Sequence, residues 1–413
     1  MRIIPGQGIC DPHVHVYNGK AYLFATHDRC PNSGGFRMDD WRIYSSDDLL
    51  NWKLEYTFRP EDTFLGKCEE CYAVDAAERN GKYYLYFSHC QTSTGVAVAD
   101  HPAGPYKDAL GKPLLEPWMV DTASYDPTVF IDDDEARTPY IIFGYTVIGK
   151  QYYIARLNED MISLAETPRP IEIINGWKND ANWVHKRNGV YYLNTHGGEY
   201  ATADNIYGPY TYRGNFHRDA TVDHGTFFTL HNQLYFTYGI PENWGEPEVD
   251  FFFRTTKMVY AHYKDNGDIT VDEFIRDAGV GQYDATWPEI KGEWYFAASD
   301  GAYKKENADG FEIRGLKDGS YLYYQNVHNM RQNAKLFIRG SPDGDKPCQI
   351  EVREGSPFGT VLGCCTVQPK PGVQDIECRL VNTHGTHSLC FVFRGEGEEI
   401  FCFDDFRFEQ IKL

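Results

Sequence analysis

Five aspartates open similar segments of the chain and could supply paired carboxylates for acid–base chemistry: Asp11, Asp75, Asp126, Asp180 and Asp223. If these positions converge in one concavity, their negative charges repel one another and their pKa values separate. One ionised and one protonated carboxyl are the groups that glycoside hydrolysis requires. The alternative is that each aspartate only caps a strand and satisfies turn amides. Proline directly follows two of them, in DPH and DPT, and fixes the direction in which the chain leaves.

The elements that must position these aspartates are short aromatic strands. In each segment the aspartate opens a strand, a turn follows, and an aromatic-rich strand returns. Three turns contain Asn-Gly, the strongest short-range signal for a β-hairpin: Asn18-Gly19, Asn80-Gly81 and Asn188-Gly189. The segments recur every roughly 45–60 residues, a spacing typical of propeller blades. We therefore predict an all-β chain with a five-bladed β-propeller, whose first strands line a central channel and bring the aspartates together.

Composition limits the remaining possibilities. A chain of 413 residues exceeds one ordinary core, which favours two domains. A formal net charge of −20 argues against nucleic acid or an anionic membrane as a partner. The eleven cysteines lack the two C-x-x-C motifs of a zinc site, so we expect reduced, mostly buried thiols. Pro5 and Gly6 interrupt the start, where a secretory signal needs an apolar run. We expect a cytoplasmic protein, with secretion of a trimmed form left open.

Several segments together resemble family 43 of the glycoside hydrolases, the arabinofuranosidase and xylosidase propellers. They are DPHVHVYNGKAYLFATHD, SSDDLLNW, CYAVDAAERNGKYYLYFS, SYDPTVFIDDD, HKRNGVYYL and YGPY. The resemblance runs from about Asp11 to about Asp284. It implies an inverting mechanism with three acidic residues. Asp11 matches the general base that activates water, and Asp126 matches the aspartate that orients the general acid and raises its pKa.

The third acidic position departs from the family pattern. The family has glutamate as the general acid before the fourth Asn-Gly turn, whereas this chain has Asp180, one methylene shorter. Asp180 could still be the acid if the site is slightly narrower. About 1 Å of misplacement costs ~10²-fold in rate, a loss that a local adjustment of the site can recover. Alternatively, Glu199 in the loop HGGEY could reach the site. A third possibility is an impaired enzyme that only binds sugar.

The same resemblance implies further site residues. His224 matches a histidine that faces an ion or a water molecule in the central channel. The predicted sugar-binding residues are Arg254 and Tyr72, with Trp41, His27 and Asp28 near the pocket on the first blade.

From about Tyr283 the chain resembles family 6 carbohydrate-binding modules, which implies a β-sandwich (jelly-roll) domain. Glu293 and Asp404 match positions that hold a structural calcium ion in that family, and oxygen ligands suit Ca²⁺. The family's stacking tryptophan and its ligand-binding asparagine are replaced by Val373 and Cys402. We therefore expect a mainly structural module, since an aromatic face supplies most sugar affinity. The predicted domains are residues 1–282 and 283–413.

Together these features predict an inverting, exo-acting hydrolase that releases terminal α-L-arabinofuranosyl or β-xylosyl residues from plant-type oligosaccharides or polysaccharides. No cofactor is required for this chemistry. The general base and acid should lie ~6.5–9.5 Å apart. An exo-galactosidase and an endo-arabinanase remain alternatives within the same fold, and a sugar-binding protein is the alternative from another class.

Overall fold

The computed structural model describes residues 2–145, 150–176, 179–217 and 222–410. These residues are almost entirely strands and turns, with α1 (Ile275–Ala278) as the one α-helix among them, so the all-β prediction is confirmed. The chain divides into two compact units. One comprises Arg2–Phe228 and Phe236–Met258, and the other comprises Thr229–Tyr235 and the residues from Val259 onward. The predicted domain boundary between residues 282 and 283 stays a prediction.

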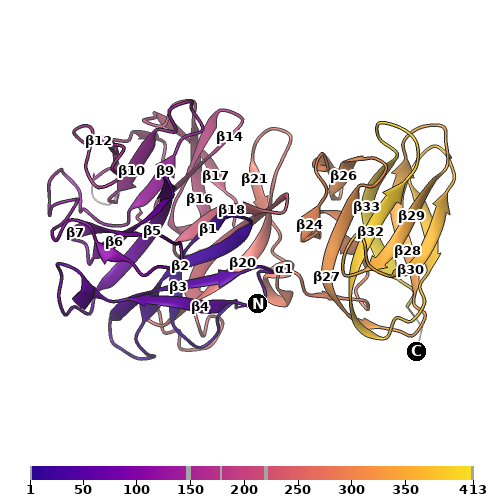
Figure 1. Cartoon of the computed structure of the whole chain (residues 1–413), viewed down its shortest axis with the longest axis horizontal. Helices are drawn as coiled ribbons and strands as arrows, with labels where there is room; N and C mark the ends of the chain where they lie inside the picture. Colours follow the sequence, from indigo (N-terminus) through magenta and orange to yellow (C-terminus); the bar gives the residue numbers. More distant parts are fainter. Residues whose placement is uncertain (1, 146–149, 177–178, 218–221, 411–413) are drawn as a thin grey trace. The chain divides into compact units, whose positions relative to one another are not determined.

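Five small sheets follow one another along the first 271 residues (Figure 1). The first contains β1 (Ile9–Tyr17), β2 (Lys20–Asp28), β3 (Met38–Ser46) and β4 (Lys53–Phe58). The second contains β5 (Cys71–Arg79), β6 (Lys82–His89), β7 (Ser93–Ala99) and β8 (Lys107–Asp108). The third contains β9 (Thr128–Ile131), β10 (Pro139–Phe143), β11 (Tyr153–Arg156) and β12 (Arg169–Pro170). The fourth contains β14 (Trp183–Arg187), β15 (Val190–Asn194), β16 (Glu199–Ala203), β17 (Tyr210–Asn215) and β13 (Ile173–Ile174). The fifth contains β18 (Gly225–Leu230), β19 (Gln233–Pro241), β20 (Arg254–Tyr263) and β21 (Ile269–Val271).

The three predicted Asn-Gly turns connect β1 to β2, β5 to β6 and β14 to β15. Both residues of each turn have positive φ angles: 52° and 77° at Asn18-Gly19, 53° and 73° at Asn80-Gly81, and 51° and 80° at Asn188-Gly189. Two consecutive positive φ angles define the hairpin turn whose twist matches that of the flanking strands. The local prediction from the sequence is therefore confirmed at all three turns.

The first strands of the five sheets contact one another in a cyclic order. Asp75 on β5 contacts His15 on β1 and accepts a hydrogen bond from Val129 N on β9. Thr128 on β9 donates a hydrogen bond to the carbonyl of Asn182, which directly precedes β14. His185 on β14 contacts Phe227 on β18, and Thr226 on β18 donates a hydrogen bond to the carbonyl of Pro12 on β1. The first strands thus surround one region, and residues at their starts can meet there.

The C-terminal residues form two sheets that pack face to face. One contains β22 (Tyr283–Asp284), β27 (Tyr321–Met330), β32 (Gly385–Arg394), β29 (Cys348–Glu354) and β30 (Val361–Val367), with β24 (Ala297–Ala298) beside β27. The other contains β25 (Tyr303–Asn307), β26 (Gly310–Leu316), β33 (Phe401–Phe408), β28 (Lys335–Pro342) and β31 (Gln374–Arg379), with β23 (Ile290–Lys291) beside β33. The ring of Tyr324 on β27 contacts those of Phe403 and Phe406 on β33. This aromatic layer joins the sheets into a β-sandwich.

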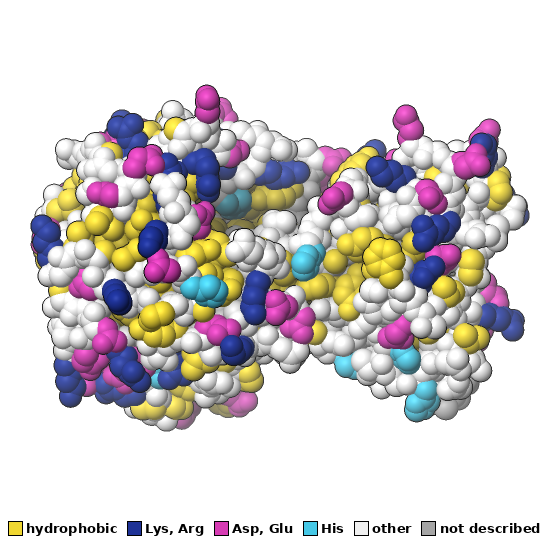
Figure 2. Space-filling model, in the orientation of Figure 1, with side chains coloured by type: hydrophobic (Ala, Val, Ile, Leu, Met, Phe, Trp, Pro, Cys, Tyr) yellow, Lys and Arg dark blue, Asp and Glu magenta, His cyan; other side chains and the backbone are white. Residues whose placement is uncertain are grey.

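Charged side chains lie on the surface, and most thiols lie in the interior. On the face drawn in Figure 2, basic and acidic side chains are interspersed. All eleven cysteines are free, and most are buried. Among the described residues, no helix is long and apolar enough to cross a membrane.

Trp41 lies in the core rather than at a sugar site, contrary to our prediction. Its side chain is 0% exposed and packs against Phe58 and Phe87, with ring centroids 5.6 and 5.1 Å away. Its indole N–H donates to the carbonyl of Tyr72 (2.7 Å). Trp41 therefore supports the main chain beneath Tyr72, and no part of its ring is open to a ligand.

We expect Trp41→Ala to lower the free energy of unfolding by about 3–5 kcal/mol, because it empties a fully buried indole site. The control is Trp118→Ala, whose side chain is 59% exposed and should change stability by about 0.5 kcal/mol or less. Denaturant unfolding monitored by circular dichroism measures both. Equal stabilities of the two variants would contradict the core position of Trp41.

Candidate functional site

The centre of the site is a buried arginine that is bonded to three carboxylates. Arg254 begins β20 and is 4% exposed. Its Nη1 donates to Asp11 Oδ1 (2.8 Å) and Asp223 Oδ2 (2.7 Å), and its Nη2 donates to Asp11 Oδ2 (3.2 Å) and Asp28 Oδ1 (2.9 Å). Its Nε donates to Asp28 Oδ2 (3.0 Å). All five N–H groups of the guanidinium thus have carboxylate acceptors, and we call this group the arginine clamp.

The clamp fixes Asp11, the predicted base. Thr26 Oγ1 also donates to Asp11 Oδ2 (2.8 Å). Asp11 is 3% exposed and has a φ angle of 47°, within an irregularity in the pairing of β1 with β2. Such a bulge redirects the side chain at the start of a strand. Both Asp11 oxygens thus accept hydrogen bonds from the guanidinium, and one of them also accepts a hydrogen bond from the hydroxyl.

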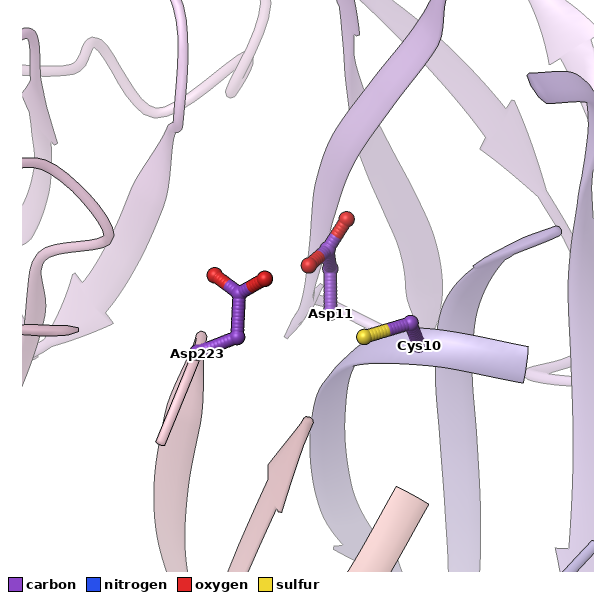
Figure 3. Close-up of side chains that lie close together, drawn as sticks. All are labelled: Cys10, Asp11 and Asp223. Atoms are coloured by element: carbon purple, nitrogen blue, oxygen red, sulfur yellow. The ribbon is translucent and has the colours of Figure 1, made fainter. Parts of the chain in front are cut away.

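Asp223 faces Asp11 from just before β18, with Cys10 beside them (Figure 3). Among the described residues, these three form the one group whose potential ligand atoms lie close enough for a metal ion. However, Arg254 Nη1 already donates to both carboxylates. Burial by itself would raise the pKa of Asp223, but the positive charge of Arg254 and the nearby His224 and His196 hold it well below its usual value. The guanidinium is therefore the cation that neutralises this pair.

Asp126, at the start of the third sheet, has a different environment. It is 4% exposed, its φ angle is 52°, and its Oδ2 accepts a hydrogen bond from Ala181 N (3.2 Å). Burial raises the pKa of Asp126 to about 8; the negative charges of Asp180 and Asp11 add to this shift, and His224 opposes it. A carboxyl with this pKa is protonated at neutral pH. Because the carboxyls interact, the proton belongs to the group as a whole.

Asp180, the predicted acid, is half-buried. The residue after it, Ala181, donates its N–H to Asp126, so Asp180 lies next to Asp126. Its Oδ2 accepts a hydrogen bond from the Tyr125 hydroxyl (3.0 Å). Its carbonyl accepts hydrogen bonds from Tyr152 (3.2 Å) and from the Thr195 hydroxyl, and Ala181 has a φ angle of 58°. These donors hold the main chain in place, so the shorter side chain projects from a fixed position.

His224 lies between the predicted catalytic carboxylates. Its Nε2 is 3.6 Å from Asp126 Oδ2 and 3.9 Å from Asp11 Oδ1. Burial lowers its affinity for a proton, but the negative charges of Asp11, Asp126 and Asp223 outweigh burial and raise its pKa. A protonated His224 would offset part of the negative charge of this group.

Other predicted residues lie outside the carboxylate cluster. Glu199 accepts a hydrogen bond from the Tyr212 hydroxyl (3.2 Å) on the neighbouring strand, which does not favour it as the acid. His27 contacts Asp40 through Nδ1 (3.0 Å) and is largely buried. Tyr72 is half-buried, and its sugar contact stays a prediction.

Asp75 does not lie at the start of its strand as we expected, but inside β5. His13 Nδ1 and His15 Nε2 lie 2.9 and 2.7 Å from its Oδ1. Burial by itself would raise the pKa of Asp75, but these histidines hold it well below its usual value. The pairing irregularity that contains Asp11 in β1 has its counterpart at Ala73 in β5. Ala73, and not Asp75, is therefore the structural equivalent of Asp11, two residues from the position that the sequence repeat indicated.

Sequence reasoning missed Tyr125 and Thr26, and it proposed Asp28 only as a pocket residue. A signal for Tyr125 existed, because it directly precedes Asp126 in SYDPT. Thr26 and Asp28 lie two residues apart on β2, so their side chains share one face of that strand. Their partners, Asp11 for Thr26 and Arg254 for Asp28, come from opposite ends of the first unit's sequence.

In the sandwich, the predicted calcium residues have separate surroundings. Glu293 is 3% exposed and lies near the positive charge of Lys304; burial nevertheless raises its pKa to about 8. Asp404 accepts a hydrogen bond from Asn307 (3.0 Å) and pairs with Arg339 (3.2 Å). No group of three potential metal ligands in the described part of the chain includes Glu293 or Asp404. Of the two substituted sugar-face positions, Cys402 is buried and Val373 is 61% exposed.

Sequence comparisons match both parts of the chain. Residues 3–200 match glycosyl hydrolases family 43, and residues 292–410 match the carbohydrate binding module of family 6. A xylosidase/arabinosidase of Bacteroides ovatus is 32% identical over 266 residues, covering 51% of this chain and 79% of that protein. An arabinoxylan arabinofuranohydrolase of Bacillus subtilis is 26% identical over 480 aligned positions, covering 97% of this chain and 90% of that protein.

Solved structures agree with this assignment. A family-43 arabinoxylan arabinofuranohydrolase from Bacillus subtilis, solved with cellotetraose, superimposes with a TM-score of 0.57 and covers 99% of this chain and 97% of its own; at 22% identity it shows the fold alone. A family-43 β-xylosidase/α-arabinofuranosidase from a compost metagenome, solved with xylotriose in a calcium-free form, has a TM-score of 0.56 and 27% identity, covering 66% of this chain and 96% of its own.

The raised pKa of Asp126 predicts how stability depends on pH. The folded state retains a proton up to about pH 8, whereas an unfolded aspartate releases it near pH 3.9. Stability from this group is full below about pH 4 and is lost as pH rises to about 8, by up to ~1.4 kcal/mol per pH unit. We therefore expect unfolding free energies of wild type and Asp126→Asn, measured from about pH 5 to about pH 8, to diverge. The control, exposed Asp47→Asn, should parallel wild type, and a parallel Asp126→Asn profile would contradict the shift.

Proposed function

Because the chain belongs to family 43 of the glycosyl hydrolases, we propose that it is an inverting, exo-acting glycosidase that releases terminal α-L-arabinofuranosyl or β-xylosyl residues from plant-type oligosaccharides and polysaccharides. The observation that carries the proposal is the convergence of Asp11, Asp126 and Asp180 around His224. The names of the relatives, xylosidase/arabinosidase and arabinoxylan arabinofuranohydrolase, support these sugars. Relatives solved with cellotetraose and xylotriose support a carbohydrate as the partner.

Asp11 is the proposed general base. The arginine clamp and Thr26 hold its carboxyl group in place, where it accepts a proton from the water molecule that attacks the anomeric carbon. Asp180 is the proposed general acid, which protonates the leaving oxygen as the glycosidic bond breaks. Asp126 holds a proton beside Asp180 at neutral pH and orients this edge of the site through its hydrogen bond with Ala181 N.

We also propose that the five sheets are the blades of a propeller. The cyclic contacts among β1, β5, β9, β14 and β18 support this arrangement, since inner strands of a propeller neighbour one another around a central axis. In such a fold the starts of the inner strands open into one funnel. This accounts for a site assembled from residues far apart in the sequence.

The sequence predicted a structural calcium ion, but the contacts of the described side chains do not favour one. Arg254 already pairs with both carboxylates of the one ligand-like group, and the partners of Asp404 are nitrogen donors. The proposed chemistry uses side chains and water. A mainly structural role of the sandwich likewise stays a proposal, supported by exposed Val373 in place of a stacking ring.

Hydrolysis assays with matched variants test the proposed roles. We expect wild type to cleave 4-nitrophenyl α-L-arabinofuranoside or β-xyloside in preference to a galactoside, and Asp11→Asn to lose activity on every substrate. Asp180→Asn should lose about 10²–10⁴-fold on natural oligosaccharides but less on the nitrophenyl substrate, because nitrophenolate leaves without protonation. Glu199→Gln is the control and should retain activity.

The outcomes separate the alternatives. An inactive wild type that binds xylotriose by calorimetry would support a sugar-binding protein. Loss of activity in Glu199→Gln alone would move the acid to Glu199. An NMR spectrum of the first product with retained anomeric configuration would contradict inversion and the predicted spacing of the two carboxyls.

Arg254→Lys tests whether this residue holds Asp11 or binds sugar. A lysine has three donors at one point and cannot replace the five donors that pair with three carboxylates. We expect kcat to fall by about 10²-fold or more with a smaller change in KM, because the base is displaced. Arg169→Lys, which alters an exposed arginine, is the control. A rise in KM with normal kcat would instead indicate a sugar contact, and Asp28→Asn provides a second, milder disruption of the clamp.

A further inference from the structure

Two thiols lie next to each other beside the proposed sugar site. The Sγ atoms of Cys68 and Cys71 are 3.6 Å apart, within the stretch Cys68-Glu69-Glu70-Cys71. Cys71 begins β5 and is 0% exposed, whereas Cys68 is partly exposed. The glycosidase mechanism uses neither thiol.

The two thiols differ in reactivity. The hydrogen bond with Cys71 lowers the pKa of Cys68 to about 7, against opposing effects of burial and of the charges of Glu70 and Glu61. The same contact raises the pKa of Cys71 far above its usual value. Cys68 is thus the thiol that ionises near neutral pH, and it is also the one of the two that solvent can reach.

The segment between the two thiols anchors the loop of the first sheet. The Glu69 carbonyl accepts a hydrogen bond from Met38 N (2.9 Å), and its carboxylate pairs with Arg29 Nη2 (2.8 Å). Met38 begins β3, and Arg29 directly follows β2. Both ends of the loop between β2 and β3 therefore depend on the position of Glu69.

The neighbouring Glu70 anchors the sugar-site edge of the second sheet. Its carbonyl accepts hydrogen bonds from Tyr72 N (3.0 Å) and Cys90 N (2.9 Å). Tyr72 is one of the predicted sugar-binding residues. A change in the backbone angles of Glu70 would move the start of β5 and the turn that contains Cys90.

An aromatic contact links this edge to the arginine clamp. Phe36, in the loop held by Glu69, lies edge-on to Tyr72 with ring centroids 6.4 Å apart. Arg254 Cζ lies 4.8 Å from the centre of the Phe36 ring, a cation–π contact. The dithiol, the two aromatic rings and the clamp on Asp11 thus form one contiguous set of contacts.

We propose that Cys68 and Cys71 are a redox-sensitive dithiol, oxidised to a disulfide by hydrogen peroxide or a low-molecular-mass disulfide, and that this modification lowers activity at the adjacent site; the second part rests on the proposed glycosidase function. With peroxide, the Cys68 thiolate attacks one oxygen and releases hydroxide, giving a sulfenic acid. Cys71 then attacks the Cys68 sulfur and releases water. Overall, two thiols and one peroxide yield one disulfide and two waters.

Closing the disulfide perturbs the site because the sulfurs must approach from 3.6 Å to about 2 Å. We expect the four-residue ring to close by rotation of the Glu69 and Glu70 backbone together with the two cysteine side chains. That rotation alters the carbonyl contacts to Met38, Tyr72 and Cys90. A displacement of about 1 Å among positioning residues is enough to change kcat/KM by ~10²-fold.

The test treats the full-length protein, fully reduced, with hydrogen peroxide or oxidised glutathione. Free thiols are then alkylated and disulfides mapped by peptide mass spectrometry, while kcat and KM are measured on the 4-nitrophenyl substrate. We expect a Cys68–Cys71 disulfide, a fall in kcat/KM of about tenfold or more, and recovery on reduction with a phosphine. Mapping distinguishes this bond from one between Cys365 and Cys378, whose thiols also interact.

Matched variants make the outcome decisive. Cys68→Ser should keep its activity under oxidant, whereas the control Cys364→Ser, at an exposed thiol in the sandwich, should respond as wild type does. Absence of the mapped bond in active protein would overturn the inference, and a mapped bond with unchanged kinetics would overturn its regulatory part. Inactivity of the reduced wild type would instead overturn the proposed function, because disulfide formation is measured independently of catalysis.

Discussion

The guanidinium of Arg254 pairs with three carboxylates that could not otherwise lie together. Asp11 and Asp28 are buried and Asp223 is partly exposed, so desolvation and mutual repulsion oppose bringing their charges together without a cation. One planar cation with five donors offsets this by giving every carboxylate a charge-assisted hydrogen bond. Removing a single partner from such a buried group leaves an uncompensated charge, which costs several kcal/mol. The shape of the site therefore depends on this one residue.

The carboxyl groups of the site lie in two different environments. Arg254 and Thr26 donate hydrogen bonds to the carboxyl oxygens of Asp11. Asp126 accepts a hydrogen bond from Ala181 N instead, and its burial, with the negative charges of Asp180 and Asp11, raises its pKa. Two aspartates with the same intrinsic chemistry thus have different partners, one as the proposed base and the other beside the proposed acid, Asp180.

Residues at the rim of the site are in contact with this centre. Phe36 covers the Arg254 guanidinium and contacts Tyr72, while Trp41 supports the Tyr72 carbonyl from the core. The Glu69-Glu70 segment holds the loop and the strand that carry these rings. A small local change at Cys68 and Cys71 can therefore act on the base without contact with it, because the groups between them are packed and hydrogen-bonded.

Short-range features of the sequence determined the strands and the three Asn-Gly hairpins, because turn geometry involves only a few neighbouring residues. The roles proposed for Asp11, Asp126 and Asp180 follow from the family resemblance of their motifs. Tertiary structure alone decided the rest. Arg254 and Asp11 are separated by 243 residues, and no local pattern shows that all five donors of Arg254 meet carboxylates. The burial of Trp41, the place of Asp75 beside two histidines, and the 3.6 Å contact of Cys68 and Cys71 likewise depend on which strands become neighbours. Burial and charge act through space, so pKa values and packing are properties of the assembled fold.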